Sequence, residues 1–122
     1  MKLILSLLII GGLAVSAAPV MAAAAPSAEA QAVARGKAAF EQLGCYQCHG
    51  YVGQGSIASG VALAPNPQPL AYYQAYVRNP RAQMPPYSKA ILSDAQLADI
   101  HAYLRSIPAG KVAAEIPLLS GR

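Results

Sequence analysis

The pentapeptide Cys45-Tyr46-Gln47-Cys48-His49 contains both cysteines of this 122-residue chain. Two cysteines separated by two residues and followed directly by a histidine form the CxxCH pattern that attaches c-type haem. On a helix-like turn, this spacing lets both sulfurs reach the vinyl groups on one edge of a porphyrin and places the histidine beneath the iron. The motif therefore predicts one covalent haem on Cys45 and Cys48, with His49 as the proximal iron ligand.

Three other uses of a cysteine pair compete with haem attachment. A disulfide between cysteines three apart closes a very small loop and stabilises little. A thioredoxin-like redox pair should lie beside a βαβ pattern, which the sequence lacks. Zinc would need a fourth ligand and another Cys or His pair. Each of these readings falls short, so haem attachment is the favoured one.

Met84 is the only methionine beyond residue 24 and is the predicted second axial ligand. Its thioether is a soft, neutral ligand that favours reduced iron, and Pro85 and Pro86 stiffen the loop and remove backbone donors. Methionine more commonly fills a gap in a core, but the isolation of Met84 among prolines favours ligation. The rival is His101, the only other histidine, whose helical angle predicts a partly exposed surface position instead.

Two longer helices are predicted on either side of the motif. The first begins at Ser27, which can cap it, and ends near Leu43 before Gly44. The second begins at Ser93, which has capping-box spacing to Gln96, and ends before Pro108. Each has one apolar face, formed by Ala32, Val33, Gly36, Ala39, Phe40 and Leu43 in the first and by Leu97, Ile100, Tyr103, Leu104 and Ile107 in the second.

These two apolar faces predict that the terminal helices pack on each other. Gly36 would allow a close approach, with Tyr103 expected to fill the gap left by its missing side chain. No strand pattern is found, so the predicted fold class is all-α. The segment after Pro108 is expected to be irregular.

The region between the two helices is predicted to be mostly loop. Glycines and prolines interrupt any period from Gly50 to Pro69, and a short helix is expected from Leu70 to Arg78, ended by Asn79-Pro80. This helix and the residues after it offer side chains that either bond a haem propionate or simply pack and face solvent. They are Tyr72, Tyr73, Tyr76, Arg78 and Arg81.

The N-terminus has the features of a secretory signal peptide. Lys2 is followed by an apolar stretch and then by small residues and Pro19. We predict a signal peptide over residues 1–24, cleaved near 22–24, and one domain over residues 25–122 exported to the periplasm. An uncleaved membrane anchor is the alternative, because no charge occurs between Lys2 and Glu29.

The formal net charge of +4 comes from basic residues that are scattered singly along the chain. Without a basic cluster, a nucleic-acid partner is not predicted. A mild positive charge instead favours encounter with acidic protein surfaces.

With these residues identified, the chain resembles class I monohaem c-type cytochromes over the length of the predicted domain. The segment Arg35-Gly36-Lys37-Ala38-Ala39-Phe40 looks like the N-terminal helix of that family, and Ala102-Tyr103-Leu104-Arg105 looks like the facing segment. The segment from Val77 to Pro108 is similar to small periplasmic cytochromes and to cytochrome subunits of dehydrogenases, in which the matching methionine is the distal ligand. One departure is that relatives often carry Gly-Pro where this chain has Gly60-Val61. In those relatives the proline carbonyl accepts a hydrogen bond from the proximal histidine; here the Val61 carbonyl is available, and whether it points at His49 stays open.

The resemblance implies a cytochrome c-like fold, in which the N- and C-terminal helices pack crosswise around one covalently attached haem. It also implies an electron carrier rather than an enzyme. The implied donor is a periplasmic dehydrogenase, and the implied acceptor is a respiratory oxidase or another cytochrome. Two alternatives stay open: a ligand-binding or peroxidase-like haem protein with a displaceable distal ligand, and a membrane-anchored cytochrome subunit of a dehydrogenase complex.

Overall fold

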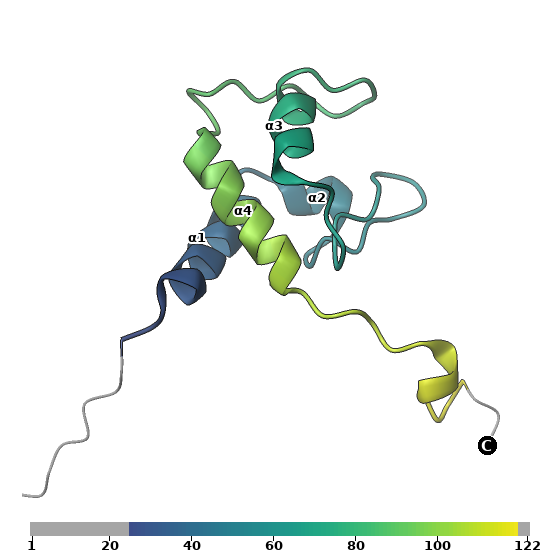
Figure 1. The fold of residues 1–122 in the computed structure, drawn as a ribbon. Coiled ribbons are helices and arrows are strands. Elements are labelled where there is room, and N and C mark those ends of the chain that lie inside the picture. Colours follow the sequence, from purple (N-terminus) through teal and green to yellow (C-terminus); the bar gives the residue numbers. More distant parts are fainter. Residues whose placement is uncertain (1–24, 120–122) are drawn as a thin grey trace, which may run out of the picture.

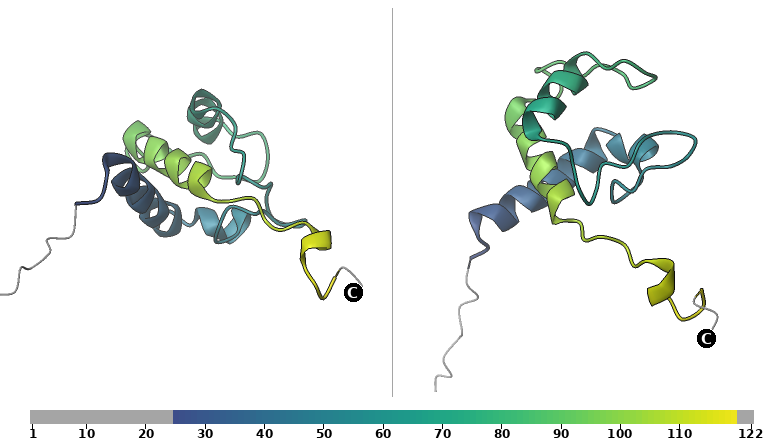
Figure 2. Two further views of the ribbon diagram at one scale, coloured as in Figure 1. Left: turned by 60° about the horizontal axis from the view of Figure 1, so that its bottom comes forward. Right: turned by 45° about the vertical axis from the view of Figure 1, so that its right-hand side comes forward.

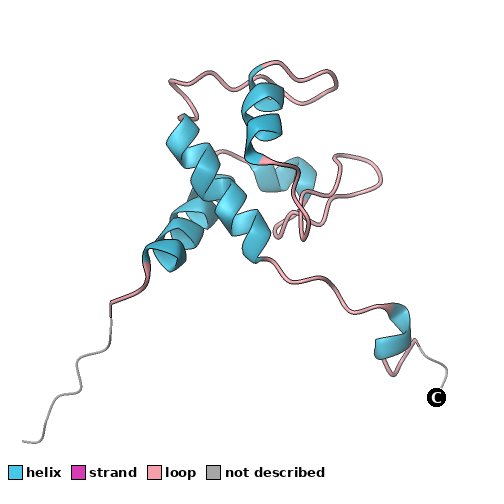
Figure 3. Ribbon diagram, in the orientation of Figure 1, coloured by secondary structure: helices cyan, strands magenta, loops and turns pink. Residues whose placement is uncertain are grey.

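The computed structural model describes residues 25–119 as helices joined by loops, without a strand among them (Figures 1 and 3). The helices are α1 (Ala28–Gln42), α2 (Cys45–His49), α3 (Leu70–Arg78) and α4 (Asp94–Ser106), followed by the short 3-10 helix η1 (Ala113–Glu115). The predicted all-α class is confirmed. The signal peptide predicted over residues 1–24 lies outside the described residues.

Helices α1 and α4 begin where the sequence predicts, because their caps form. The hydroxyl of Ser27 accepts from the Ala30 amide at 3.1 Å. At the start of α4, the Ser93 hydroxyl accepts from the Gln96 amide while the Gln96 side chain accepts from the Ser93 amide, which completes the capping box. These bonds satisfy backbone donors that have no partner within the helix.

The central feature of the fold is the crossing of α1 and α4 (Figure 1). A Cβ atom placed on Gly36 would lie 1.9 Å from the Asp99 carbonyl oxygen, so the glycine lets the two backbones touch. The predicted close approach is confirmed. The prediction that Tyr103 fills the gap is wrong: the three atoms nearest to that position belong to the Asp99 and Ile100 backbone, and the Tyr103 ring packs on Phe40 with centroids 5.7 Å apart.

The hydrophobic core lies at this crossing and extends along α4 towards α3. Its fully buried large side chains come from α1, from α4 and from the loop that precedes α4; they are Phe40, Leu92, Leu97 and Leu104. On the rim, Arg35 of α1 donates two hydrogen bonds to the Asp99 carboxylate of α4, at 2.7 and 2.9 Å. The crossing is thus an apolar contact with an ion pair at its edge.

Helix α3 has the predicted bounds and contacts α4, while α2 follows directly on α1 (Figure 2). After α4 the chain runs away from the helices to η1, as expected for an irregular C-terminal segment. Within residues 25–119, none of the helices has the length and apolar character that a membrane crossing requires.

Candidate functional site

The CxxCH motif forms α2, a single helical turn placed at the end of α1 by a glycine. Gly44 adopts φ 74°, a left-handed conformation that side chains disfavour, and it turns the chain from α1 into α2. Cys45 is half-buried and Cys48 is exposed, and neither forms a disulfide. Burial raises the pKa of the Cys45 thiol to about 11. Cys45 therefore lacks the low pKa of a reactive redox thiolate.

His49, the last residue of α2, is held by a backbone carbonyl. Its Nδ1 atom lies 2.8 Å from the Val61 carbonyl oxygen. Since a carbonyl can only accept, Nδ1 carries the proton, and in the neutral ring Nε2 keeps its lone pair. This is the arrangement of a metal-ligating histidine, whose other nitrogen donates to a fixed acceptor. The Val61 carbonyl is thus the hydrogen-bond acceptor for His49, although this chain has valine where relatives often carry proline.

The loop after α2 wraps closely around the motif. The Gly55 amide donates to the His49 carbonyl at 2.8 Å, and the Ser59 hydroxyl donates to the Cys48 carbonyl at 2.9 Å. A Cβ atom on Gly60 would lie 2.8 Å from the Cys48 carbonyl oxygen and 3.1 Å from His49 Nδ1. Only a residue without a side chain allows this approach, so the loop forms a tight cradle around the imidazole.

Met84 lies on a separate segment, the loop between α3 and α4. It is half-buried and packs against the hydrophobic core. The structure therefore brings Cys45, Cys48 and His49 together on one turn, whereas Met84 approaches the core from a loop 35 positions later in the chain than His49.

Tyr87 connects the Met84 loop to the motif, and the sequence analysis missed it. Its hydroxyl donates to the Leu43 carbonyl at 3.1 Å, two residues before Cys45. Burial and the nearby Cys45 and Cys48 raise the pKa of this phenol. The sequence feature that could have indicated a role for Tyr87 is its position three residues after Met84, directly following two prolines.

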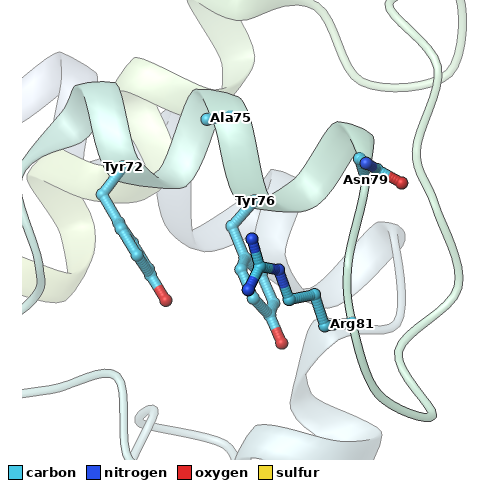
Figure 4. Close-up of a pocket in the computed structure, with 5 residues that line it drawn as sticks. All are labelled: Tyr72, Ala75, Tyr76, Asn79 and Arg81. Atoms are coloured by element: carbon cyan, nitrogen blue, oxygen red, sulfur yellow. The ribbon is translucent and has the colours of Figure 1, made fainter.

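The residues considered for a propionate divide into two groups. Arg78 and Tyr73 are already engaged: Arg78 pairs with Asp94 at 2.7 Å, and the buried Tyr73 hydroxyl points to the Leu63 carbonyl at 3.5 Å. The others line an open pocket of about 460 Å³ (Figure 4). The lining residues are Tyr72, Ala75, Tyr76, Asn79 and Arg81.

Two phenols of this pocket extend from the same side of α3. The rings of Tyr72 and Tyr76 are stacked 5.6 Å apart, and Figure 4 shows both hydroxyls pointing away from the helix. Within residues 25–119, no ion-pair partner is found for the Arg81 guanidinium. These phenol and guanidinium donors have the chemistry to receive an anionic group.

The His101 side chain contacts the loop before α3 and a ring of α3. Its Nε2 atom lies 2.9 Å from the Gln68 carbonyl oxygen, and its ring meets Tyr73 edge-on at 5.5 Å. It joins α4 to the loop before α3 and is half-buried, as the predicted partly exposed position requires.

The donor set fits a covalently attached haem better than the competing uses of a cysteine pair. Both cysteines are free, and Nε2 of His49 retains a lone pair. Among residues 25–119 no group of three or more Cys, His, Asp or Glu could hold a zinc ion, and no strand accompanies the motif as a thioredoxin-like pair would require.

An all-α fold built on crossed terminal helices, with a CxxCH turn between them, defines a c-type cytochrome domain. The family model described as cytochrome c oxidase, cbb3-type, subunit III matches residues 31–104, more than half of the chain, and the chain belongs to this family. The predicted class and the covalent haem c are confirmed, with Cys45 and Cys48 fitting the attachment motif. No curated protein and no solved structure matched the chain.

Proposed function

We propose that this chain is a single-electron carrier whose haem iron is bound axially by His49 and Met84. When bound, the haem supplies an iron that exchanges one electron at a time. The observation that carries the proposal is the 2.8 Å contact between His49 Nδ1 and the Val61 carbonyl, which leaves Nε2 as the donor and fixes the plane of the imidazole. A fixed ring limits movement between redox states, which favours rapid electron transfer.

Met84 is the best candidate for the opposite side of the iron. Its thioether is the only methionine sulfur within residues 25–119, and its loop is bonded through Tyr87 to Leu43, the C-cap of α1. The rival ligand, His101, has its Nε2 atom in contact with the Gln68 carbonyl and its ring against Tyr73. A neutral sulfur ligand would favour reduced iron and raise the potential.

The pocket on α3 supports a second part of the proposal. We place the propionates near Tyr72, Tyr76 and Arg81, because these donors lie together and Arg81 lacks an ion-pair partner within residues 25–119. A charge-assisted hydrogen bond from the guanidinium would offset the negative charge of a carboxylate.

The axial assignment is tested by the absorption spectrum of the purified holoprotein. Ferric wild-type protein should show the weak far-red charge-transfer band of sulfur bound to iron. Met84→Ala should abolish this band and lower the reduction potential by more than about 59 mV, the shift for a tenfold change in a one-electron equilibrium. Gln83→Ala, at an exposed neighbour on the same loop, is the matched control and should leave both unchanged. An unaltered spectrum in Met84→Ala would refute the assignment.

The same protein separates electron transfer from ligand-binding or peroxidase-like activity. A saturated iron should bind carbon monoxide slowly in the reduced state and should not turn over peroxide. Rapid binding by the wild-type protein, at the rate of Met84→Ala, would instead identify a displaceable distal position.

We further propose that the mature protein works in the periplasm, accepting electrons from a dehydrogenase and passing them to an oxidase or another cytochrome. The support is the signal-like pattern of residues 1–24 and the scattered positive charge of the chain. N-terminal sequencing of the purified protein tests export, since an intact Met1 would favour the anchored alternative. Reduction kinetics of the haem with candidate dehydrogenases would identify the donor.

A further inference from the structure

The loop that carries Met84 is bonded to α3 through the backbone of a single residue. The Tyr87 amide donates to the Val77 carbonyl at 2.9 Å, and Arg78 Nη1 donates to the Tyr87 carbonyl at 2.8 Å. Both partners lie at the C-terminal end of α3, so the main chain at Tyr87 is held on both of its polar groups. The loop returns to the body of the protein at this point.

The side chain of the same residue bonds to a different part of the molecule. Its hydroxyl donates to the Leu43 carbonyl at 3.1 Å. Leu43 is the C-cap of α1, where helix carbonyls lack partners within the helix. Because Gly44 and the CxxCH turn follow directly, this bond joins the Met84 loop to the segment that positions both cysteines and His49.

The short distance along the chain makes this bond matter for Met84. Tyr87 lies three positions after Met84, and three steps of extended chain span at most about 10 Å. Pro85 and Pro86 reduce the flexibility of this link further. The outer part of the loop is held as well, since Lys89 and Arg78 both pair with Asp94 at 2.7 Å.

We propose that Tyr87 is the positioning residue for the distal ligand, and that its hydrogen bond to Leu43 keeps the Met84 sulfur in place against competing ligands. This inference rests on the proposed ligation by Met84. On this proposal, displacement of Met84 by an external ligand moves its loop away from Leu43 and breaks the Tyr87 hydrogen bond, so that the bond contributes to the ligated state specifically. Loss of the bond should therefore favour the displaced state.

The test is imidazole binding to the ferric holoprotein of wild type and Tyr87→Phe. A protein hydrogen bond contributes about 1 kcal/mol net, so Tyr87→Phe should bind imidazole about three- to tenfold more tightly. The far-red band should remain in the absence of imidazole, because the phenyl ring still packs and Met84 is unchanged.

Tyr103→Phe is the matched control for a purely structural effect. The Tyr103 hydroxyl donates to the Tyr51 carbonyl, also at 3.1 Å, but Tyr51 follows His49 by two positions and neither residue belongs to the Met84 loop. Both variants should lose similar stability in chemical denaturation, while only Tyr87→Phe should gain imidazole affinity.

The outcomes separate this inference from the function on which it rests. If wild type shows the far-red band but Tyr87→Phe and Tyr103→Phe bind imidazole equally, Tyr87 has only a structural role and the inference is overturned. If the band is absent from wild type and Met84→Ala binds imidazole as wild type does, the ligation itself is overturned.

Discussion

The crossing of α1 and α4 and the surroundings of the CxxCH turn are held together in different ways. The crossing buries large apolar side chains and brings two backbones into contact at Gly36. Around the motif, individual hydrogen bonds to main-chain carbonyls hold the loops, such as those from His49 to Val61 and from Tyr87 to Leu43. The first region depends on shape and area, the second on the direction of a few donors.

This difference predicts different consequences of substitution in the two regions. A buried apolar contact involves many atoms, so a change in side-chain volume mainly alters the free energy of unfolding. A hydrogen bond contributes only about 1 kcal/mol net, yet its loss can change the orientation of a residue that binds the iron. Substitutions at the crossing should mainly lower the free energy of unfolding, whereas those around the motif should mainly change the properties of the haem iron.

Gly36→Ala should give the largest loss of stability. At an ordinary helical position alanine is more stable than glycine by about 1 kcal/mol, but here the added methyl would lie 1.9 Å from the Asp99 carbonyl oxygen. We expect the helices to separate and the free energy of unfolding to fall by about 1–3 kcal/mol. Chemical denaturation of the holoprotein measures this change, and the far-red band of the folded protein should persist.

Gly110→Ala is the control for this substitution, since a Cβ there meets no atom within 4 Å. Its stability should match wild type. Equal effects of the two substitutions would show that the crossing does not depend on the missing side chain.

Gly60→Ala makes the same chemical change beside the motif and should have a smaller effect on stability, about 1 kcal/mol. The new methyl would lie 2.8 Å from the Cys48 carbonyl oxygen and 3.1 Å from His49 Nδ1, so the loop must retreat and loosen the Val61 bond. A weaker bond makes the imidazole less basic. The reduction potential should rise, by less than about 59 mV.

Potentiometric titration of Gly60→Ala and Gly36→Ala side by side sharpens the comparison. The potential should move in the first variant and stay constant in the second. The opposite pattern would mean that the crossing, and not the cradle, controls the ligand.

The helices could be predicted from the sequence because their signals are local. Caps at Ser27 and Ser93 and the proline after Asn79 lie within a few residues of the helix ends that they determine. The contact at Gly36 was only half predictable: a glycine on an apolar face indicates close approach, but which atoms fill the gap depends on the depth and register of the crossing. That register places the Asp99 backbone there and moves Tyr103 onto Phe40.

The site could be predicted only as far as its motif reaches. Cys45, Cys48 and His49 lie within five residues, so their placement on one helical turn follows from their spacing. The bonds that orient them join residues 12 and 44 positions apart, from His49 to Val61 and from Tyr87 to Leu43. A hydroxyl and a main-chain carbonyl leave no pattern in a sequence, because every residue offers the carbonyl.

The smallest effect that we predict concerns the acid side of stability and Asp94. Hydrogen bonds from Lys89 and then Arg78 hold the pKa of this carboxylate below its ordinary value of 3.8. Since the folded pKa is the lower one, the carboxylate contributes to stability above pH 3.8, and the contribution disappears as the pH falls through the folded pKa. Asp94→Asn should therefore be less stable than wild type at neutral pH, and the gap should close in acid. Denaturation at a series of pH values measures the gap, and Lys89→Gln should reduce it in part. Asp94 is partly exposed, and its ion pairs with Arg78 and Lys89 are therefore open to screening by salt. If the difference in stability between wild type and Asp94→Asn also disappears at high salt, these ion pairs act as screened surface pairs.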